Sequence, residues 1–473
     1  MKVIKNYLYN AFYQIFILLV PLITSPYLAR VLGPKGVGIN DYTNAVIQFF
    51  IIFGSIGVAL YGNRQVAYVR NNREKLTNTF YEIFFMRMIT IGIAYVAFFI
   101  FLSLVHRFQI YYLAQSFSLL AAAFDISWFF QGVENFAVTV LRNLLVKIIT
   151  LISIFTLVKS YSDLATYILI LSLSLLIGNL TLFPSLKRYI GLPDWKHFHL
   201  WKHLHPSLVL FIPEIATQIY LYVNKYMLGL MTNVTQAGFF GQSDKIIKMS
   251  LAVVTATGMV MLPHVANAFQ RGEMERVRGY LYTTFEFVTA LSIPLTCGIA
   301  AVAPSFVPLF FSSKFMPVIP LMMLEAIVIV LIAWSNAIGV QYLVPTGQNK
   351  AYNYSVILGA IVNIVANIPL ILLWGAAGTA LATVLSELCV TIYQIYIIRD
   401  QIDLKRLFNG YFKYLIAGII MFLLVFTMDI ELKDTWGMLA LEIVVGMISY
   451  LLMLLILRPQ LVQNVLQKVI KKN

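Results

Sequence analysis

Apolar stretches of roughly 20 residues follow one another along the whole chain, and only short polar segments separate them. A helix needs about 20 consecutive apolar residues to cross a membrane, whereas the strands of a membrane barrel are shorter and alternate in polarity. The pattern therefore predicts an all-α polytopic membrane protein with about fourteen transmembrane helices. They are expected near residues 9–31, 40–62, 79–105, 109–131, 138–158, 164–184, 208–230, 237–262, 280–303, 318–342, 352–373, 376–398, 411–428 and 436–457.

One long polar segment interrupts this pattern between the sixth and seventh expected helices, from Lys187 to His205. Residues 57–76 and 258–277 align without a gap, so the first six helices are expected to recur as a parallel repeat in the next six. Substrate sites of such transporters lie at the interface of the repeats. The predicted parts are an N-terminal six-helix lobe (1–190), a cytoplasmic interfacial linker (191–207), a C-terminal six-helix lobe (208–400), and helices 13 and 14 with a cytoplasmic tail (401–473).

The composition excludes a soluble protein, because 60% of the 473 residues are hydrophobic and only 11% are charged. Soluble domains carry about 25% charged residues. The net charge of +14 does not indicate a nucleic-acid partner, since the lysines and arginines concentrate on alternate loops. By the positive-inside rule, this distribution predicts that both termini lie in the cytoplasm.

Charged residues and glycines break the apolar pattern in the segment Pro26–Tyr42, which joins the first two expected helices through a short Gly/Pro turn. A weaker copy of this turn follows around Gly229 and Gly238. A charge at the centre of a membrane helix costs roughly 2.5–3.5 kcal/mol on insertion scales, so it usually faces a polar cavity. The two related turns therefore predict a transport cavity between two lobes.

Cationic side chains near the two turns are the predicted substrate-binding residues: Arg30, Lys225, Lys245 and Lys248. This set suits an anionic substrate, because arginine can hold two phosphate oxygens at once and lysine acts as a point charge. Two alternatives stay open. Arg30 and Lys225 can extend to the outer membrane interface, and Asp244 can form a local ion pair with Lys248.

Carboxylates are predicted to line the same cavity or to bind a coupling ion: Asp41, Asp244, Glu214 and Asp125. Asp41 and Asp244 follow the glycines of the two turns. Glu214 follows Pro213, where a broken helix would free backbone groups. A buried carboxyl group can titrate and take part in a proton relay. A purely structural role is the alternative for each of the four.

Histidines and tryptophans gather in the linker, at Trp195, His197, His199, Trp201, His203 and His205. The four-residue spacing of His199 and His203 is compatible with zinc, but a basic, aromatic helix lying on anionic headgroups also explains the cluster. We predict the interfacial helix and no metal site. Cys297 and Cys389 lie in apolar stretches without metal or redox spacing and are expected to be buried.

No catalytic motif is present in the sequence. It lacks a phosphate-binding loop, a nucleophile elbow and a zinc-protease histidine pair. We therefore expect no enzyme activity, no catalytic residues and no bound cofactor. Any uphill transport would have to draw on an H⁺ or Na⁺ gradient or on the substrate gradient.

The segment Arg30–Gly38 (RVLGPKGVG) resembles the N-terminal signature of the polysaccharide-synthesis flippase family. That family belongs to the multidrug/oligosaccharidyl-lipid/polysaccharide exporter superfamily. Asp125–Glu134 (DISWFFQGVE) is similar to the fourth-helix segment of the family, and Asn363–Glu387 resembles its eleventh-to-twelfth-helix pattern. These similarities span roughly residues 5–400.

The resemblance implies a transporter that flips undecaprenyl-pyrophosphate-linked oligosaccharide repeat units to the outer leaflet by alternating access. The implied location is the bacterial cytoplasmic (inner) membrane, and the implied pathway is capsule, exopolysaccharide or O-antigen assembly. It also implies a cationic cavity for the pyrophosphate, a groove for the lipid tail at helices 13 and 14, and partners such as a polysaccharide polymerase and export machinery.

Two other classes compete with this interpretation. A cation-coupled multidrug exporter of the same superfamily would need an acidic cavity, whereas the four cations outnumber the nearby carboxylates Asp41 and Asp244. A membrane-embedded polysaccharide polymerase or ligase would need a sizeable external loop, and all the expected external loops are short. A scaffold without transport activity would leave the charges in the apolar segments unexplained.

Overall fold

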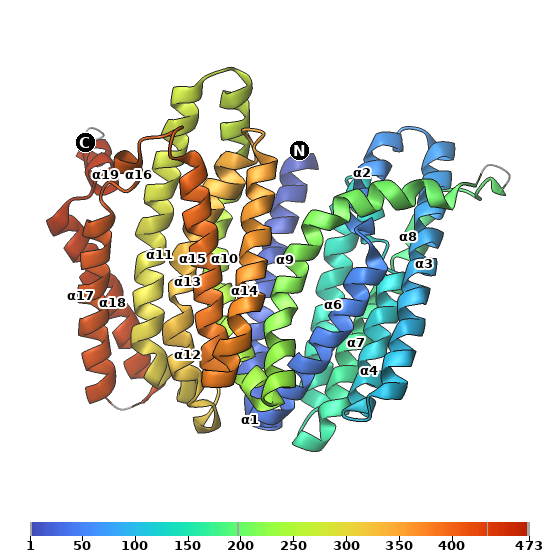
Figure 1. Ribbon diagram of the computed structural model, residues 1–473, viewed down its shortest axis with the longest axis horizontal. Helices are drawn as coiled ribbons and strands as arrows, with labels where there is room; N and C mark the ends of the chain where they lie inside the picture. Colours follow the sequence, from blue (N-terminus) through green and yellow to red (C-terminus); the bar gives the residue numbers. More distant parts are fainter. Residues whose placement is uncertain (1, 196–197, 433, 471–473) are drawn as a thin grey trace. The chain divides into compact units, whose positions relative to one another are not determined.

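The computed structural model describes residues 2–195, 198–432 and 434–470. Side chains are described within these ranges except at 2–19, 136–137, 212–214, 216–217, 220, 257–260, 465–466 and 468–470. The described residues form helices and no strand, which confirms the predicted all-α class (Figure 1). Among them, eleven helices are long and apolar enough to cross a membrane, or twelve if a bent pair counts as one span. The chain is an integral membrane protein.

The chain forms two compact units, unit 1 (Met1–Gly229) and unit 2 (Leu230–Asn473). The helices of unit 1 are α1 (Lys2–Ser55), α2 (Val58–Val69), α3 (Arg73–Leu104), α4 (Gln109–Ala123), α5 (Ser127–Gly132), α6 (Phe136–Leu157), η1 (Tyr161–Asp163), α7 (Leu164–Leu180), α8 (Phe183–Leu186), η3 (Leu200–His203) and α9 (Leu204–Met231), whose last residues cross the unit boundary. The helices of unit 2 are α10 (Val234–Gln270), α11 (Met274–Phe310), η4 (Ser313–Phe315), α12 (Val318–Glu325), α13 (Ile327–Ser335), the π-helix η5 (Asn336–Leu343), α14 (Asn349–Trp374), α15 (Ala376–Ile398), α16 (Leu404–Leu407), α17 (Tyr411–Glu431), α18 (Trp436–Leu457) and α19 (Gln460–Ile470).

The first two expected helices lie in α1, which is interrupted at Gly33. In Figure 1, the first part of α1 descends from the N-terminus, and its second part climbs back towards α2. By length and hydropathy, however, Val20–Val69 is a single candidate span, and α9 is not among the eleven. The number of fourteen transmembrane helices therefore stays a prediction.

The division into units differs from the predicted lobe boundary at the polar linker. The segment 208–229, which the sequence assigned to the C-terminal lobe, belongs to unit 1. Just before it, the hydroxyl of Ser207 donates a hydrogen bond of 2.6 Å to the carbonyl of Ile56. Near its end, Tyr226 stacks on Tyr42. These contacts join positions far apart in the sequence, so the polar composition of the linker could not reveal them.

The sequence repeat has a structural counterpart in two helix–turn–helix segments. In residues 57–76, α2 ends at Val69 and α3 begins at Arg73. In residues 258–277, α10 ends at Gln270 and α11 begins at Met274. The helix ends thus fall at aligned positions of the two segments.

Aromatic rings fill the core of unit 1 where α3 meets α5. Phe80 stacks on Trp128 with 5.7 Å between ring centroids, and it meets Phe129 edge-on at 5.1 Å. All three side chains are almost fully buried. Offset-stacked and edge-to-face pairs are the favoured aromatic geometries, so this cluster holds the two helices in register.

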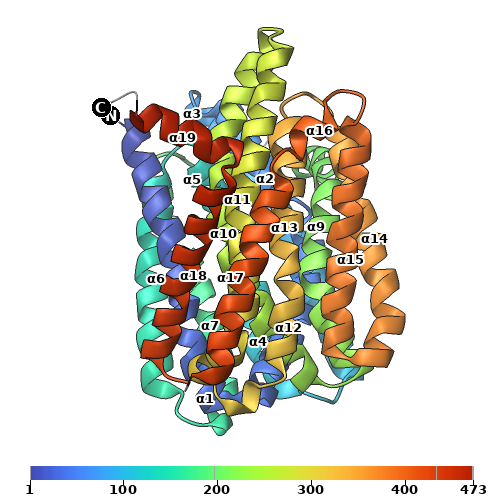
Figure 2. The ribbon, with the colours of Figure 1, turned by 90° about the vertical axis from the view of Figure 1, so that its left-hand side faces the viewer.

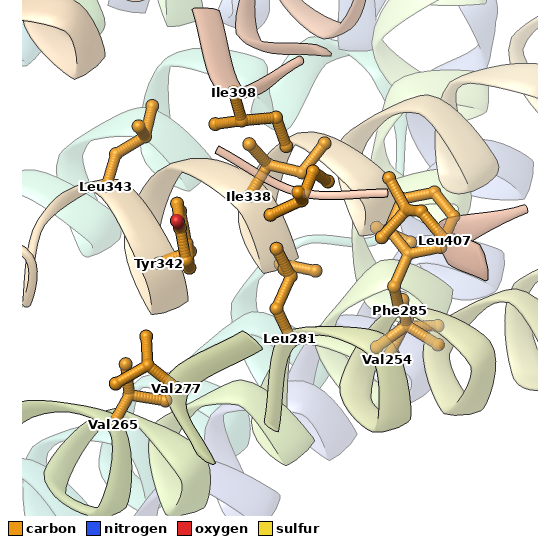
Figure 3. Close-up of a cluster of buried hydrophobic side chains, with 14 of the residues drawn as sticks. Val254, Val265, Val277, Leu281, Phe285, Ile338, Tyr342, Leu343, Ile398 and Leu407 are labelled. Carbon is orange, nitrogen blue, oxygen red and sulfur yellow. The ribbon is translucent and has the colours of Figure 1, made fainter. Parts of the chain in front are cut away.

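Unit 2 has its own core, built around α11 and η5 (Figure 3). Leu281 and Phe285 of α11 lie with Ile338 and Tyr342 of η5 in one buried cluster, which Ile398 at the end of α15 joins. The long helices α17 and α18 pack on each other and on α11 (Figure 2). The predicted helices 13 and 14 correspond to this pair.

Candidate functional site

The charged turn predicted in unit 1 is centred on the break in α1. Gly33 has φ 65° and ψ 178°, a conformation that a residue with a Cβ rarely adopts. Pro34 follows and has no amide hydrogen to continue the helix. The turn is fixed to the end of α6, because the Tyr27 hydroxyl donates a hydrogen bond of 2.6 Å to the Val158 carbonyl. The sequence therefore builds a rigid corner rather than a flexible loop.

Arg30 and Asp41 lie on either side of this corner and differ in their surroundings. Arg30 is exposed on the surface of the chain, whereas Asp41 is half-buried. The Oδ2 atom of Asp41 is enclosed, and no donor among the described residues bonds to it. Its Oδ1 atom accepts a long hydrogen bond of 3.4 Å from the Asn40 side-chain amide. Asp41 thus presents one carboxylate oxygen that no donor among the described residues satisfies.

Lys225 of α9 belongs to the same unit as Arg30 and Asp41. Its neighbour Tyr226 stacks on Tyr42, with 5.9 Å between centroids and ring planes 3° apart. Gly229 allows this approach, because a Cβ there would lie 2.2 Å from the Tyr42 ring. Lys225 is half-buried. The segment after the break in α1 and the end of α9 therefore meet through Tyr42 and Tyr226, the residues that follow Asp41 and Lys225.

The remaining predicted cations lie on α10 in unit 2. Lys248 forms an ion pair with Asp244 at 2.8 Å, which is the local pair that the sequence left as an alternative. Lys245 donates a long hydrogen bond of 3.4 Å to the Gln242 side chain. Ser243, which follows Gln242 in the sequence, is buried and hydrogen-bonds the buried carboxylate of Glu325 on α12. The structure thus brings Asp244 and Lys248 together, while Ser243 ties α10 to α12.

Asp125 has contacts that a structural role explains. Arg87 of α3, with 5% of its side chain exposed, donates a hydrogen bond of 2.9 Å to the Asp125 carbonyl and lies 3.7 Å from its carboxylate. The other carboxylate oxygen accepts from the Ser127 amide at the start of α5. Asp125 therefore pairs with a buried arginine and accepts from the first backbone amide of α5. The side chain of Glu214 lies outside the described residues.

A second polar cluster, which the sequence did not reveal, fixes the linker to unit 1. Glu82 of α3 is buried and accepts from Lys202 Nζ at 2.7 Å, His203 Nε2 at 2.9 Å and the His199 amide at 2.8 Å. His203 Nδ1 lies 2.7 Å from the Tyr61 hydroxyl. The sequence did contain a signal for this cluster, because Glu82 is an acidic residue inside an apolar run.

The linker differs from the predicted interfacial helix. In its described part, the short 3₁₀ helix η3 is followed directly by α9. Trp195 and Trp201 are exposed, as an interfacial segment requires, but His203 is buried. Burial holds the pKa of His203 below its usual value, although the neighbouring Glu82 carboxylate acts in the opposite direction. Among the described residues, no group of three or more His, Cys, Asp or Glu could hold a metal ion.

The fold is similar to those of known transporters. Over 94% of this chain and 98% of the other, it matches a lipid II flippase MurJ in an inward closed conformation, with a TM-score of 0.77 and 15% identity. An inward-facing multidrug resistance MATE family transporter of the MOP superfamily matches with a TM-score of 0.63 and 13% identity, over 81% and 98% of the two chains. These similarities show the fold: the chain is a polytopic membrane protein built like these transporters.

The sequence comparison identifies the family. The polysaccharide biosynthesis protein family matches residues 3–269, more than half of the chain, and the chain belongs to that family. This confirms the resemblance noted in the sequence.

Curated relatives are distant. A protein of Escherichia coli (strain K12), provisionally named an O-antigen transporter, is 22% identical over 408 residues, which cover 84% of this chain and 97% of its own. The lipid II flippase MurJ of Bacillus subtilis (strain 168) is 24% identical over 179 residues, covering 37% and 31%.

Proposed function

We propose that this protein is a flippase that moves undecaprenyl-pyrophosphate-linked oligosaccharide repeat units from the cytoplasmic to the outer leaflet. The observation that carries the proposal is the similarity, over 84% of this chain, to a protein provisionally named an O-antigen transporter, joined to a MurJ-like fold. The glycan would serve capsule, exopolysaccharide or O-antigen assembly, and a polysaccharide polymerase and export machinery would receive it. The protein would lie in the bacterial cytoplasmic membrane with both termini in the cytoplasm.

The physical task is to carry a pyrophosphate through a hydrocarbon layer. Moving even a singly charged ion of carboxylate size from water into a medium of low dielectric costs of order 20 kcal/mol if it is unpaired. Fixed cations must therefore replace its hydration. We propose Arg30 and Lys225 as the pyrophosphate-binding cations of unit 1, and Lys245 and Lys248 as those of unit 2.

The ion pair of Lys248 with Asp244 does not prevent such a role. The Lys248 side chain is 45% exposed, and an ion pair of this kind contributes only about 0.2–0.5 kcal/mol on a helix surface. A pyrophosphate carries more charge than one carboxylate and can compete for the ammonium group. Lys245 donates to the neutral side-chain amide of Gln242 at 3.4 Å, so a pyrophosphate would not have to displace a charged group from that contact.

Alternating access would expose these cations first to one membrane face and then to the other. The protein has no ATP-binding motif in its sequence, so we propose coupling to an H⁺ or Na⁺ gradient. Asp41 is the proposed coupling residue, because its enclosed oxygen has no donor among the described residues. Asp125 does not belong to the proposed site, because its contacts with Arg87 and the Ser127 amide give it a structural role.

A deletion strain tests the function directly. Lipid-linked repeat units would be assayed on each face of the membrane, with and without the restored gene. Accumulation on the cytoplasmic face that the wild-type gene relieves supports flipping, whereas normal export in the deletion strain refutes it. Unchanged lipid distribution together with increased sensitivity to cationic drugs would favour a multidrug exporter, the class to which one structural neighbour belongs.

A further inference from the structure

Two carboxyl groups lie buried between the last two long helices, at the end where the short loop 432–435 joins them. Asp429 of α17 is 5% exposed and Glu442 of α18 is 1% exposed. Neither residue belongs to the proposed substrate site. Ionised carboxylates are almost never fully buried without a partner, so this pair needs an explanation.

The hydrogen bonds around the pair leave two oxygens without a donor. Asp429 Oδ1 accepts from the Ser305 amide of α11 at 3.3 Å. Asp429 Oδ2 and Glu442 Oε2 are both enclosed, and no donor from the described residues reaches either atom. The two carboxyl groups are near enough to each other to share a hydrogen bond. Two carboxylates offer only acceptors, so such a bond forms only when one of them carries a proton.

The surrounding charges add to the demand for a proton. Asp434, exposed in the connecting loop, accepts from the Ser305 hydroxyl at 2.9 Å and adds a third carboxylate. From α11, the element packed against both helices, the contact to these acids is the polar but uncharged Ser305. Within the described residues no lysine or arginine pairs with Asp429, Asp434 or Glu442. Lys433 of the same loop lies outside the described residues.

We propose that Asp429 and Glu442 form a proton-binding site in which one proton is shared between two carboxyl groups. Loading forms one O–H bond with a proton taken from water, and release returns that proton to water and leaves two facing carboxylates. Asp434 and Ser305 connect the buried pair to the exposed loop and mark the route of exchange. Among the described residues, no group of three or more His, Cys, Asp or Glu is arranged to hold a metal ion, so these three carboxyl groups do not form a metal site.

This site makes the packing of α18 on α17 depend on pH. With the proton in place, the carboxyl groups attract each other through a hydrogen bond. Without it, like charges face each other inside apolar surroundings, and the helix ends are driven apart. This inference goes beyond the proposed function and does not depend on which substrate the protein carries.

Infrared difference spectroscopy tests the proposal on the full-length protein in lipid nanodiscs. The spectrum at neutral pH is compared between wild type, Glu442→Gln and Asp429→Asn. We expect a protonated-carboxyl band in wild type that is lost in each variant, because a remaining single carboxylate accepts from the new amide and needs no proton. Glu431→Gln changes an exposed carboxyl at the end of α17 and should keep the band.

Thermal unfolding gives a second measurement. The folded wild type retains a proton that the unfolded chain has already released, so its melting temperature should fall as the pH rises. The double variant Asp429→Asn/Glu442→Gln keeps a neutral, hydrogen-bonded pair and should lose this dependence. A band that survives in both single variants would overturn the proposal. So would displacement of the band by NaCl at constant pH, which would identify a cation site instead.

Discussion

The imidazole of His203 lies 2.9 Å from the carboxylate of Glu82, although 121 residues separate them in the sequence. Both side chains are almost completely buried. Lys202 adds a cation to the same carboxylate at 2.7 Å, and the backbone amide of His199 binds its other oxygen. Glu82 thereby ties the segment between the sixth and seventh expected helices to α3.

Replacing Glu82 should destabilise the protein measurably. Glu82→Ala leaves the buried donor of His203 without an acceptor, at about 1–3 kcal/mol, and also removes the acceptor of the His199 amide. Glu82→Gln keeps an acceptor and should lose less. Thermal unfolding in detergent measures the effect. Glu74→Gln, an exposed change on the same helix, is the control, and equal melting temperatures for Glu82→Ala and this control would contradict the assigned role.

His203 should make stability depend on pH in a defined direction. Its pKa lies below the usual value of about 6.5 because burial disfavours the imidazolium form. Below that pH the unfolded chain binds a proton that the folded protein does not, so stability should fall as the pH drops. Above about 6.5 both states are neutral and the effect disappears. When the stability measured by unfolding is plotted against pH, His203→Gln should lose less stability at acid pH than wild type. Equal losses would contradict the prediction.

Removal of the proposed pyrophosphate cations should reduce export without removing the protein from the membrane. Hydrogen bonds to charged groups contribute about 1.5–3 kcal/mol, so Arg30→Ala or Lys225→Ala should each weaken substrate binding about tenfold or more. Surface glycan in the deletion strain measures export, and membrane immunoblots measure protein level. Arg188→Ala is a matched control, since Arg188 is an exposed arginine just after α8 and is not one of the proposed cations. Full glycan export by the double variant Arg30→Ala/Lys225→Ala would contradict the assignment of these two cations to pyrophosphate binding.

Asp41 should control coupling more than binding. Asp41→Asn keeps the shape of the side chain and removes its capacity to gain or lose a proton. We expect export to persist at a reduced rate and to become insensitive to dissipation of the ion gradient. Export in cells treated with an ionophore, compared between wild type and the variant, provides the measurement. A variant that remains as sensitive as wild type would show that coupling lies elsewhere.

The stacking of Tyr42 on Tyr226 should depend on Gly229. A methyl group there would lie 2.2 Å from the Tyr42 ring, so Gly229→Ala must displace the ring or move α9. Overpacking of this kind costs about 1–3 kcal/mol. Gly92→Ala meets open space and should instead be neutral or stabilising. Combining Gly229→Ala with Tyr42→Ala should recover part of the loss in thermal unfolding, and no recovery would place the strain elsewhere.

Local sequence patterns determined the membrane class, the positions of most helices and the family. Apolar runs set the helices because lipid offers no hydrogen-bond partner to an open backbone. The gapless repeat predicted two turns at aligned positions. In the structure α2 and α10 end at Val69 and Gln270, and the helices that follow them begin at Arg73 and Met274. The charged segment around Arg30 carried the family signature, and the family comparison confirmed it. The substrate-binding roles of Arg30, Lys225, Lys245 and Lys248 stay predictions.

Only the tertiary structure decided which polar residues are partners. Arg87 could be seen as a charge in an apolar run, but its pairing with Asp125 depends on how α3 meets α5. Glu82 and His203 meet across 121 residues, and Asp429 and Glu442 are buried because α17 and α18 pack on α11. A sequence shows where a charge is expensive, because that follows from local hydrophobicity. Which group compensates it depends on the packing of distant helices, and local composition carries no record of that packing.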